Sequence, residues 1–490
     1  MPTLFLFLPL VGAILALMLP KHREHEAKWI ALAFTTLAFA VSIAIFVWFD
    51  PDQVGYQMVD QFKWINPGGG GFEVQYIVGV DGLSAPMVLL LGLLSVVAVL
   101  VSFSVEVRVK EYFAYLLLLE TAVAGVFLSL DLIQFFLFWE LELLPMYMLI
   151  SLWGTGRNRY SAMKFLIYTL AGSALMLVGF LVLGFAGGTF EISALVEAPP
   201  QDTLVPLSLV FWAIMLAFLV KLPIFPFHTW LPDAHTDAPT AVSVMLAGVL
   251  LKMGGYGILR IVLPILPEQA HDFRVLLAAL AGFSVVYGAV ITLQQRDLKR
   301  LIAYSSVSHM GYVLLGMFAL SAVGMSGAAL QMFTHGTITG LLFVMVGLVY
   351  ERTHTREISE MSGLMHRMPL IGTVMLLAGL ASLGLPGMSG FVAELTTFLG
   401  AFDAHPAATI AGIFGVVLAA GYILWTVQRV FHGPADEKWE HLTDANHWWE
   451  YTAMASLVIV IFAVGIFPSL LTESIESGIE PIAALFGDSA

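Results

Sequence analysis

Cysteine is absent from the 490-residue sequence, and charged residues are scarce. Without cysteine the chain forms no disulfide, no zinc–thiolate site and no cysteine-ligated iron–sulfur cluster. Asp, Glu, Lys and Arg make up 11% of the residues, against roughly a quarter in an average soluble domain, whereas 59% are hydrophobic. This composition excludes an ordinary soluble enzyme, a disordered chain and a nucleic-acid binder, and it predicts a protein that crosses a lipid bilayer many times.

Two further signals are missing. The first apolar stretch, residues 4–19, has no basic residues before it and no clear small-residue cleavage site, so we interpret it as a retained membrane span and not as a signal peptide. The glycines at 68–71 are not followed by Lys and Ser or Thr, which argues against a phosphate-binding loop. With Pro67 they are expected to form the turn of a hairpin over residues 61–80, where apolar residues alternate on both arms.

Long apolar segments fill most of the sequence. We count about fourteen, and a crossing needs about 20 residues, so we predict an all-α polytopic membrane protein that forms a single transmembrane domain, 1–490. Within it we expect N-terminal helices with an external hairpin (1–110), a five-helix repeat (111–266), a second, inverted repeat (267–430), and a C-terminal helix with a tail (431–490).

The repeats are inferred from two interrupted segments. The seventh segment is broken by prolines between Lys221 and Asp233, and the twelfth by glycines and a proline between Gly384 and Glu394. Proline removes a helical hydrogen bond, and broken backbone at membrane depth persists only inside protein or beside water. Because five spans is an odd offset, a unit repeated at that distance is inverted, an arrangement typical of transporters.

The basic residues predict the orientation. Sixteen of the 21 Lys and Arg residues lie in the six loops that follow odd-numbered segments, so we expect these loops in the cytoplasm and both termini outside. The external side is then acidic, with residues such as Asp52, Glu197 and Glu476.

Several ionisable residues lie inside apolar segments, where each charge costs about 2.5–3.5 kcal/mol on insertion scales. These residues are Glu120, Glu140, Glu142, Lys221, Lys252, His309, His335 and Glu394. Stability does not explain them, so they must form pairs, reach water or exchange protons. A buried lysine holds its proton best beside a carboxylate, so moving the carboxylate switches proton binding, although a fixed structural ion pair is the alternative.

Spacing leaves several of these assignments open. Glu140 and Glu142 point about 200° apart on a helix, so only one of them faces a given interior site. His309 and His335 are either proton carriers or hydrogen-bonded core histidines. Asp81 and Asp131 lie near segment ends and are expected to be caps or interface residues.

His228 and His235 flank Asp233, which raises the possibility of a metal site. The intervening proline and the lack of other ligands favour a different interpretation. In this interpretation the histidines satisfy the broken backbone or line a water path.

Four strings resemble the antiporter-like membrane subunits of respiratory complex I. They are FWELELLPMY (138–147), KLPIFPFHTWLPDAH (221–235), LKMGGYG (251–257) and DLKRLIAYSSVSHMGY (297–312). The resemblance extends from VGVDGLS (78–84) to about Arg429. Glu394 makes the chain most similar to the M-type, or chain 4, members, because the other types typically carry lysine there.

The resemblance implies a role for each membrane charge. Glu140 and Lys221 form an ion pair that gates proton uptake. Lys252 is the central relay group, assisted by His309 and His335, and Glu394 is the terminal group on the release side.

The resemblance also implies partners and cofactors. The chain would lie in the bacterial inner membrane between the two other antiporter-like subunits. With no dinucleotide fingerprint or cluster ligand of its own, it would carry no cofactor, and NADH, FMN, iron–sulfur clusters and quinone would belong to other subunits. Four alternatives stay open: a multi-subunit sodium/proton antiporter, a membrane-bound hydrogenase, a photosynthetic ferredoxin-driven complex, and a purely structural membrane subunit.

Overall fold

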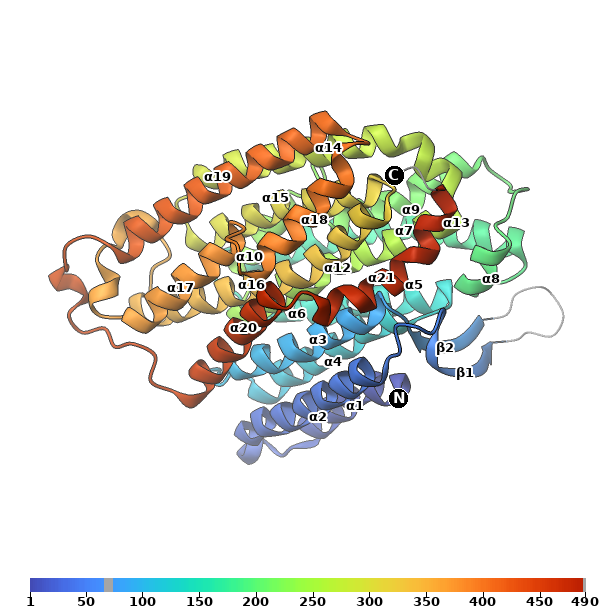
Figure 1. The fold of residues 1–490 in the computed structure, drawn as a ribbon. Coiled ribbons are helices and arrows are strands. Elements are labelled where there is room, and N and C mark those ends of the chain that lie inside the picture. The colour runs from blue at the N-terminus through green and yellow to red at the C-terminus, as the bar shows by residue number, and fades with distance from the viewer. Residues whose placement is uncertain (66–73, 488–490) are drawn as a thin grey trace.

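The computed structural model describes residues 1–65 and 74–487 and shows a bundle of helices with one small hairpin (Figure 1). The helices of ten residues or more are α1 (Pro2–Met18), α2 (Ala27–Trp48), α3 (Ser84–Leu100), α4 (Val109–Leu128), α5 (Leu132–Leu141), α6 (Leu143–Trp153), α7 (Asn158–Gly187), α9 (Leu207–Lys221), α14 (Pro267–Leu293), α15 (Leu298–Phe318), α16 (Ala322–Thr353), α17 (Pro369–Ser382), α18 (Ser389–Phe402), α19 (Pro406–Phe431), α20 (Trp448–Ile466) and α21 (Ser469–Ala483).

Shorter pieces complete the bundle. They are α8 (Ile192–Glu197), α10 (Trp230–Asp237), α11 (Thr240–Met245), the π-helix η2 (Leu246–Leu250), α12 (Leu251–Gly257), the π-helix η3 (Ile258–Val262) and α13 (Leu263–Ile265).

Ten continuous helical segments in the described part are long and apolar enough to cross a membrane. Five further apolar helices are shorter, namely α1, α3, α9, α17 and α18. The predicted all-helical polytopic architecture is therefore confirmed. Both expected interruptions are present, because α9 stops at Lys221 before α10 begins, and α17 and α18 are separated by residues 383–388.

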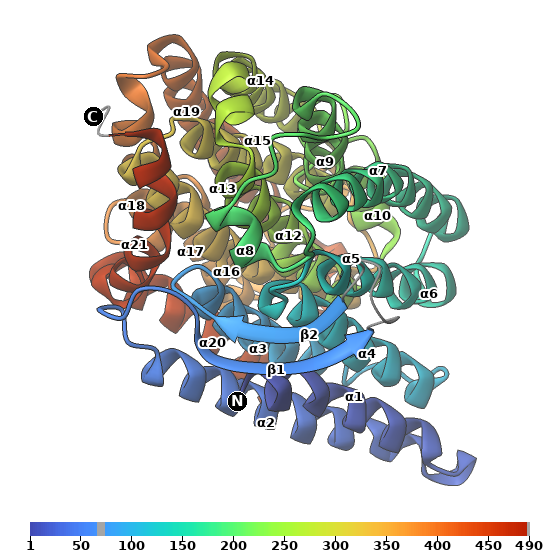
Figure 2. The same cartoon turned by 90° about the vertical axis from the view of Figure 1, so that its right-hand side faces the viewer.

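The hairpin consists of β1 (Gln57–Ile65) and β2 (Val74–Val80), which pair antiparallel with Phe62 opposite Tyr76. Its expected turn at Pro67–Gly71 lies outside the described residues. The hairpin lies at the same end of the bundle as α8 and α13 (Figures 1 and 2). The terminal ammonium group of Met1 lies 3.5 Å from Asp60, and α21 packs against Gly82, so both ends of the chain reach this end of the molecule.

Asp131 separates α4 from α5 as the sequence analysis expected. Its backbone is extended, and its carboxylate accepts hydrogen bonds from the backbone N–H groups of Ile133 and Gln134, which satisfies the first turn of α5. Burial raises the pKa of Asp131 to about 6, against the lowering effect of these N–H groups. The Gln134 side chain in turn accepts a hydrogen bond from the backbone of Ile77, which fixes the hairpin on α5.

The innermost layer is formed by α16 and by the run from α11 to α13. In each of these two segments, every residue of the most apolar 18-residue stretch is buried. In outer helices such as α2, α7 and α19, only about a third of the residues in the most apolar stretch are buried. These helices expose apolar residues, for example Val47, Val178 and Val417. An apolar outer surface of this extent fits a lipid or subunit environment.

Candidate functional site

Lys252 lies in the innermost layer and has two polar partners. The π-helical turn η2 precedes it, and its ammonium group donates a hydrogen bond to the carbonyl of Ala247 in that turn. A π-turn disrupts the regular ladder and occurs often at functional sites. The Lys252 Nζ atom also lies 2.7 Å from Nδ1 of His335 on α16. Lys252 and His335 are both buried.

A row of buried polar groups continues from His335. The rings of His335 and His309 are 5.5 Å apart, and Nδ1 of His309 lies 3.4 Å from Oε1 of Glu394 near the start of α18. Ser382, the last residue of α17, places its hydroxyl 3.4 Å from Nε2 of His309. Lys252, the two histidines and Glu394 therefore form one connected group that joins four separate helices.

The break between α17 and α18 makes room for Glu394. Gly384 has a φ of +77°, a conformation that L side chains rarely adopt, and a Cβ atom there would lie 2.6 Å from Oε2 of Glu394. On another side, Glu394 borders an apolar groove of about 410 Å³ between α18 and α19.

Lys221 at the end of α9 forms an ion pair with Glu142, and both side chains are fully buried. The Lys221 ammonium group also lies over the rings of Trp139 and Phe165, 5.4 and 5.3 Å from their centroids. Such contacts add to the stabilisation of a desolvated cation.

This pair corrects the one that the resemblance implied, because Glu140 is not the partner of Lys221. Glu142 shares a helix face with Trp139 and Met146, which are buried. Glu140 instead shares a face with Leu137 and Leu144, which are 42% and 50% exposed, and it forms no ion pair among the described residues.

The helices that carry Lys221 and Lys252, α9 and α12, approach each other closely. A Cβ atom on Gly254 would lie 2.7 Å from the carbonyl oxygen of Phe218 and 2.8 Å from the backbone nitrogen of Leu222. Gly254 is two residues from Lys252, and Leu222 directly follows Lys221. The backbones that carry the two lysines are therefore in direct contact.

Within the described residues, the remaining predicted residues form no hydrogen bond or ion pair with this row. His235 stacks on Phe343 with ring centroids 4.5 Å apart, and His228 contacts the rings of Phe225 and Tyr287. Both histidines are buried, and their ring nitrogens have no hydrogen-bond partner.

No metal site is formed around these histidines. No group of three or more His, Asp or Glu residues in the described part of the chain could hold a metal ion. Asp233, the proposed third ligand, instead forms ion pairs with Lys164 and Arg300.

Glu120 on α4 is also buried, next to Ser95, Thr35 and Met245. Its carboxylate oxygens have no hydrogen-bond partner, and no contact links it to Lys252 or Lys221. The structure does not include Glu120 in either group.

A second buried cation, Arg260, lies in the same segment as Lys252 and was not expected from the sequence. Arg260 binds Asp81 through two hydrogen bonds of 2.6 and 2.5 Å and also donates to the hydroxyls of Tyr56 and Tyr256. Asp81 also accepts hydrogen bonds from the backbone N–H groups of Leu83 and Ser84 at the start of α3, which suits the expectation of a cap or interface residue near a segment end. The missed signal was a second basic residue eight positions after Lys252 in an otherwise apolar segment.

Known proteins share this architecture. Residues 129–419 match the family described as "NADH:quinone oxidoreductase/Mrp antiporter, TM". The chain is 40% identical over 485 residues to NADH-quinone oxidoreductase subunit M of Rhodobacter capsulatus, covering 96% of this chain and 93% of that protein. It is 41% identical to NAD(P)H-quinone oxidoreductase chain 4 2 of Thermosynechococcus vestitus, covering 97% and 90%.

A solved structure agrees with these relatives. A chain of respiratory complex I from Thermus thermophilus superimposes with a TM-score of 0.90 at 30% identity, covering 99% of this chain and all of that one. The chain therefore belongs to the NADH:quinone oxidoreductase/Mrp antiporter family of membrane subunits, and the two relatives named above are a subunit M and a chain 4.

Proposed function

We propose that this chain is a proton-pumping membrane subunit of an NADH:quinone oxidoreductase. The observation that carries the proposal is the buried row formed by Lys252, His335, His309 and Glu394, next to the Glu142–Lys221 pair. Ionisable groups are rare inside membrane proteins and mark ion pathways, and here Lys252, His335, His309 and Glu394 follow one another at short distances.

The lysines would act as switched proton carriers. While Glu142 neutralises Lys221, the ammonium form is favoured, and separation of the pair favours release of a proton toward Lys252. The proton then moves from Lys252 to the histidines and is taken up by the Glu394 carboxylate, which becomes a neutral acid before releasing it. Each group returns to its first protonation state when the next proton arrives.

We further infer how the chain crosses the membrane and which subunits surround it. We infer fourteen spans in two inverted five-helix repeats, 111–266 and 267–430, between the segments 1–110 and 431–490. The chain would lie in a bacterial inner membrane with both termini on the periplasmic side and the two other antiporter-like subunits beside it. NADH, FMN, iron–sulfur clusters and quinone would be bound by other subunits.

A Lys221→Met variant tests the proposed path. In sealed vesicles that contain the whole complex, we expect NADH-driven proton uptake to be lost because the buried pair has no cation. Lys21→Met, which removes an exposed lysine of the first basic loop, is the matched control and should pump normally. Wild-type proton-to-electron stoichiometry in Lys221→Met would refute the path.

A second candidate is the photosynthetic complex driven by ferredoxin that the sequence left open, and the observation that keeps it is the 41% identity to NAD(P)H-quinone oxidoreductase chain 4 2 of Thermosynechococcus vestitus. Purification of the complex through a tag on this chain distinguishes the two. Quinone reduction with NADH supports the respiratory complex, whereas reduction with ferredoxin and not with NADH supports the photosynthetic one.

A further inference from the structure

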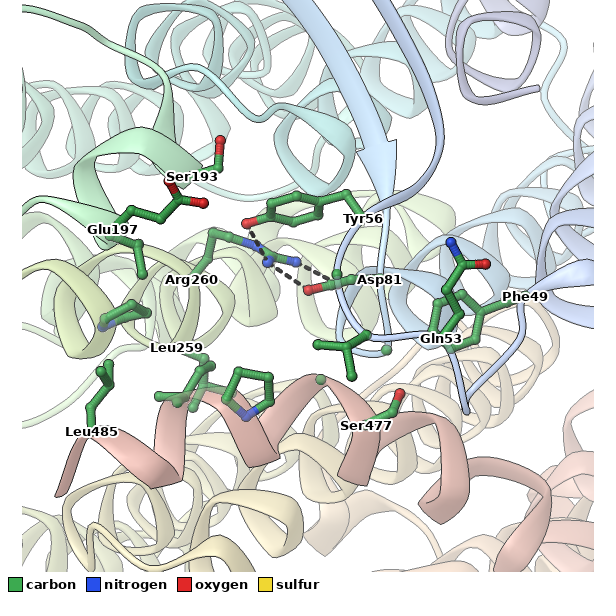
Figure 3. Close-up of a pocket in the computed structure, with 18 residues that line it drawn as sticks. Phe49, Gln53, Tyr56, Asp81, Ser193, Glu197, Leu259, Arg260, Ser477 and Leu485 are labelled. Atoms are coloured by element: carbon green, nitrogen blue, oxygen red, sulfur yellow. Dashed lines mark hydrogen bonds and ion pairs between the residues drawn. The ribbon is translucent and has the colours of Figure 1, made fainter. Parts of the chain in front are cut away.

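A cavity of about 270 Å³ lies at the hairpin end of the bundle (Figure 3). Its wall is built by the segment after α2, the Asp81 turn, α8, the end of η3 and the inner face of α21. Polar groups such as Ser193, Glu197 and Ser477 line it, and at roughly 30 Å³ per liquid water molecule the space is sufficient for several waters.

Arg260 and its partners form one wall of this cavity (Figure 3). The guanidinium group lies between Tyr56 and Asp81 and donates to both, and its Nε–H donates to Tyr256 behind it. The Tyr256 hydroxyl in turn donates to the carbonyl of Phe127. Arg260 is therefore held in one position by Tyr56 and Asp81 from two other parts of the chain and by Tyr256 from its own helical run.

The same run of helix connects Arg260 to Lys252. Tyr256 follows Lys252 by four residues, and Arg260 follows Tyr256 by four, so the three residues occupy successive turns. At a rise of 1.5 Å per residue the backbone positions of Lys252 and Arg260 are about 12 Å apart. Arg260 thus stands between the central lysine and the cavity.

We propose that Arg260 is an electrostatic barrier that prevents protons in this cavity from reaching Lys252. This inference rests on the proposed proton path, because only a chain with a proton-carrying centre needs such a barrier. The cavity is at the acidic end of the protein, where Glu197 attracts cations, so an open connection would let pumped protons return to the centre.

The chemistry of the cluster suits a barrier and does not suit a carrier. A guanidinium group keeps its proton in proteins, and a fixed arginine charge is a known device for excluding protons from a pore. Asp81 is not a free base, because its oxygens accept from Arg260 and from the backbone N–H groups of Leu83 and Ser84. Burial acts to raise the pKa of Asp81, but Arg260 and these N–H groups hold it below its ordinary value.

The turn that carries Asp81 is itself fixed by the C-terminal helix α21. A Cβ atom on Gly82 would lie 2.0 Å from the carbonyl oxygen of Ser474, and one on Gly478 would lie 2.6 Å from the backbone nitrogen of Leu83. The two backbones therefore touch. This contact holds the Asp81 carboxylate against Arg260 and closes one side of the cavity.

The test compares passive proton flux in proteoliposomes that contain the whole complex, with an imposed pH gradient and no NADH. The key pair is Asp81→Asn alone, which keeps the guanidinium group, and Asp81→Asn with Arg260→Met, which removes it without leaving an unpaired buried carboxylate. We expect the first to be as tight as the wild type. We expect flux through the second to rise on the order of tenfold, equivalent to a barrier lowered by about 1.4 kcal/mol.

Two further variants separate charge from packing. Arg260→Lys keeps the positive charge, so its passive proton flux should be as low as that of the wild type. Adding Lys252→Met to the leaky double variant should restore tightness, because the leak passes through the central lysine. The barrier would be overturned if Arg260→Lys leaked as much as the Asp81→Asn, Arg260→Met double variant, if that double variant did not leak, or if its leak persisted after Lys252→Met was added.

The proposed function is checked separately by NADH-driven pumping of the Lys252→Met single variant. Normal pumping would mean that the path itself is wrong. Lost pumping together with a tight Arg260 double variant would mean that only the barrier is wrong.

Discussion

Glu140 and Glu142 differ only in which neighbours share their helix face. Because they are two residues apart on a helix, one of them faces inward and the other outward, but the spacing does not tell which is which. Large apolar residues occur on both faces, namely Trp139 and Met146 on one and Leu137 and Leu144 on the other. Only the tertiary packing, which places Trp139 against Phe218 of α9, buries the first face, and so it selects Glu142 as the partner of Lys221.

The two glutamates should therefore respond differently to neutralisation. Glu142→Gln leaves the Lys221 ammonium buried without a counter-charge, and we expect a loss of about 3–5 kcal/mol in stability together with loss of pumping. Glu140→Gln changes a half-buried carboxylate without an ion pair and should cost at most about 1 kcal/mol. Thermal unfolding of the purified complex and vesicle pumping measure both effects. The opposite order would show that Glu140 pairs with Lys221 in the working enzyme.

At the scale of single elements, helix ends followed from short-range chemistry. Asp131 is a cap in the sequence and in the structure, and the proline- and glycine-rich strings interrupt α9 and α17 where they occur. The π-helical turns η2 and η3 could not be predicted, because the residues around Lys252 and Arg260 have an ordinary helical pattern. At η2 the Lys252 side chain combines a local hydrogen bond to the carbonyl of Ala247 with a tertiary contact to His335 on α16, and the second of these depends on the fold.

The Asp131 cap predicts a pH dependence of stability. Its pKa of about 6 lies above the unfolded value of about 3.9, so the folded state binds more protons between these values. Stability from this group is therefore present below about pH 4 and lost as the pH rises through 6, by up to about 3 kcal/mol.

Asp131→Asn is the matched variant, because asparagine retains the capping acceptor and does not titrate. We expect its melting temperature to exceed that of the wild type increasingly between pH 4.5 and 7. A difference that is constant across this range would show that Asp131 does not titrate there.

At the scale of the whole molecule, the packing of the helices brings functional groups from distant parts of the sequence together inside the bundle. The run from α11 to α13 and helix α16 are enclosed by the other helices, so Lys252 and His335 meet although 83 residues separate them. The outer helices remain apolar on their exposed faces. Polar and charged groups are thus concentrated inside the bundle and at its ends.

The absence of cysteine permits a direct test of the orientation. Gln201, near α8, and Glu437, in the last basic loop, are both exposed, so a single cysteine can replace either one. On intact cells a membrane-impermeant maleimide should label the chain with Gln201→Cys and not the one with Glu437→Cys, because positive loops stay in the cytoplasm. After permeabilisation both should react. Labelling of Glu437→Cys alone in intact cells would reverse the proposed topology.

The sequence by itself determined that this chain is a helical membrane protein, where its interrupted helices lie and that ionisable residues such as Lys221, Lys252 and Glu394 lie inside apolar segments. These features depend on composition and on local backbone chemistry, which are independent of the rest of the fold. Only the tertiary structure decided that Glu142 pairs with Lys221, that Glu120 forms no contact with either lysine, and that Arg260 and Asp81 bind each other in the wall of the cavity at the hairpin end. The physical reason is that the cost of burying a charge is fixed by its residue type, whereas its partner is fixed by which helix faces pack together.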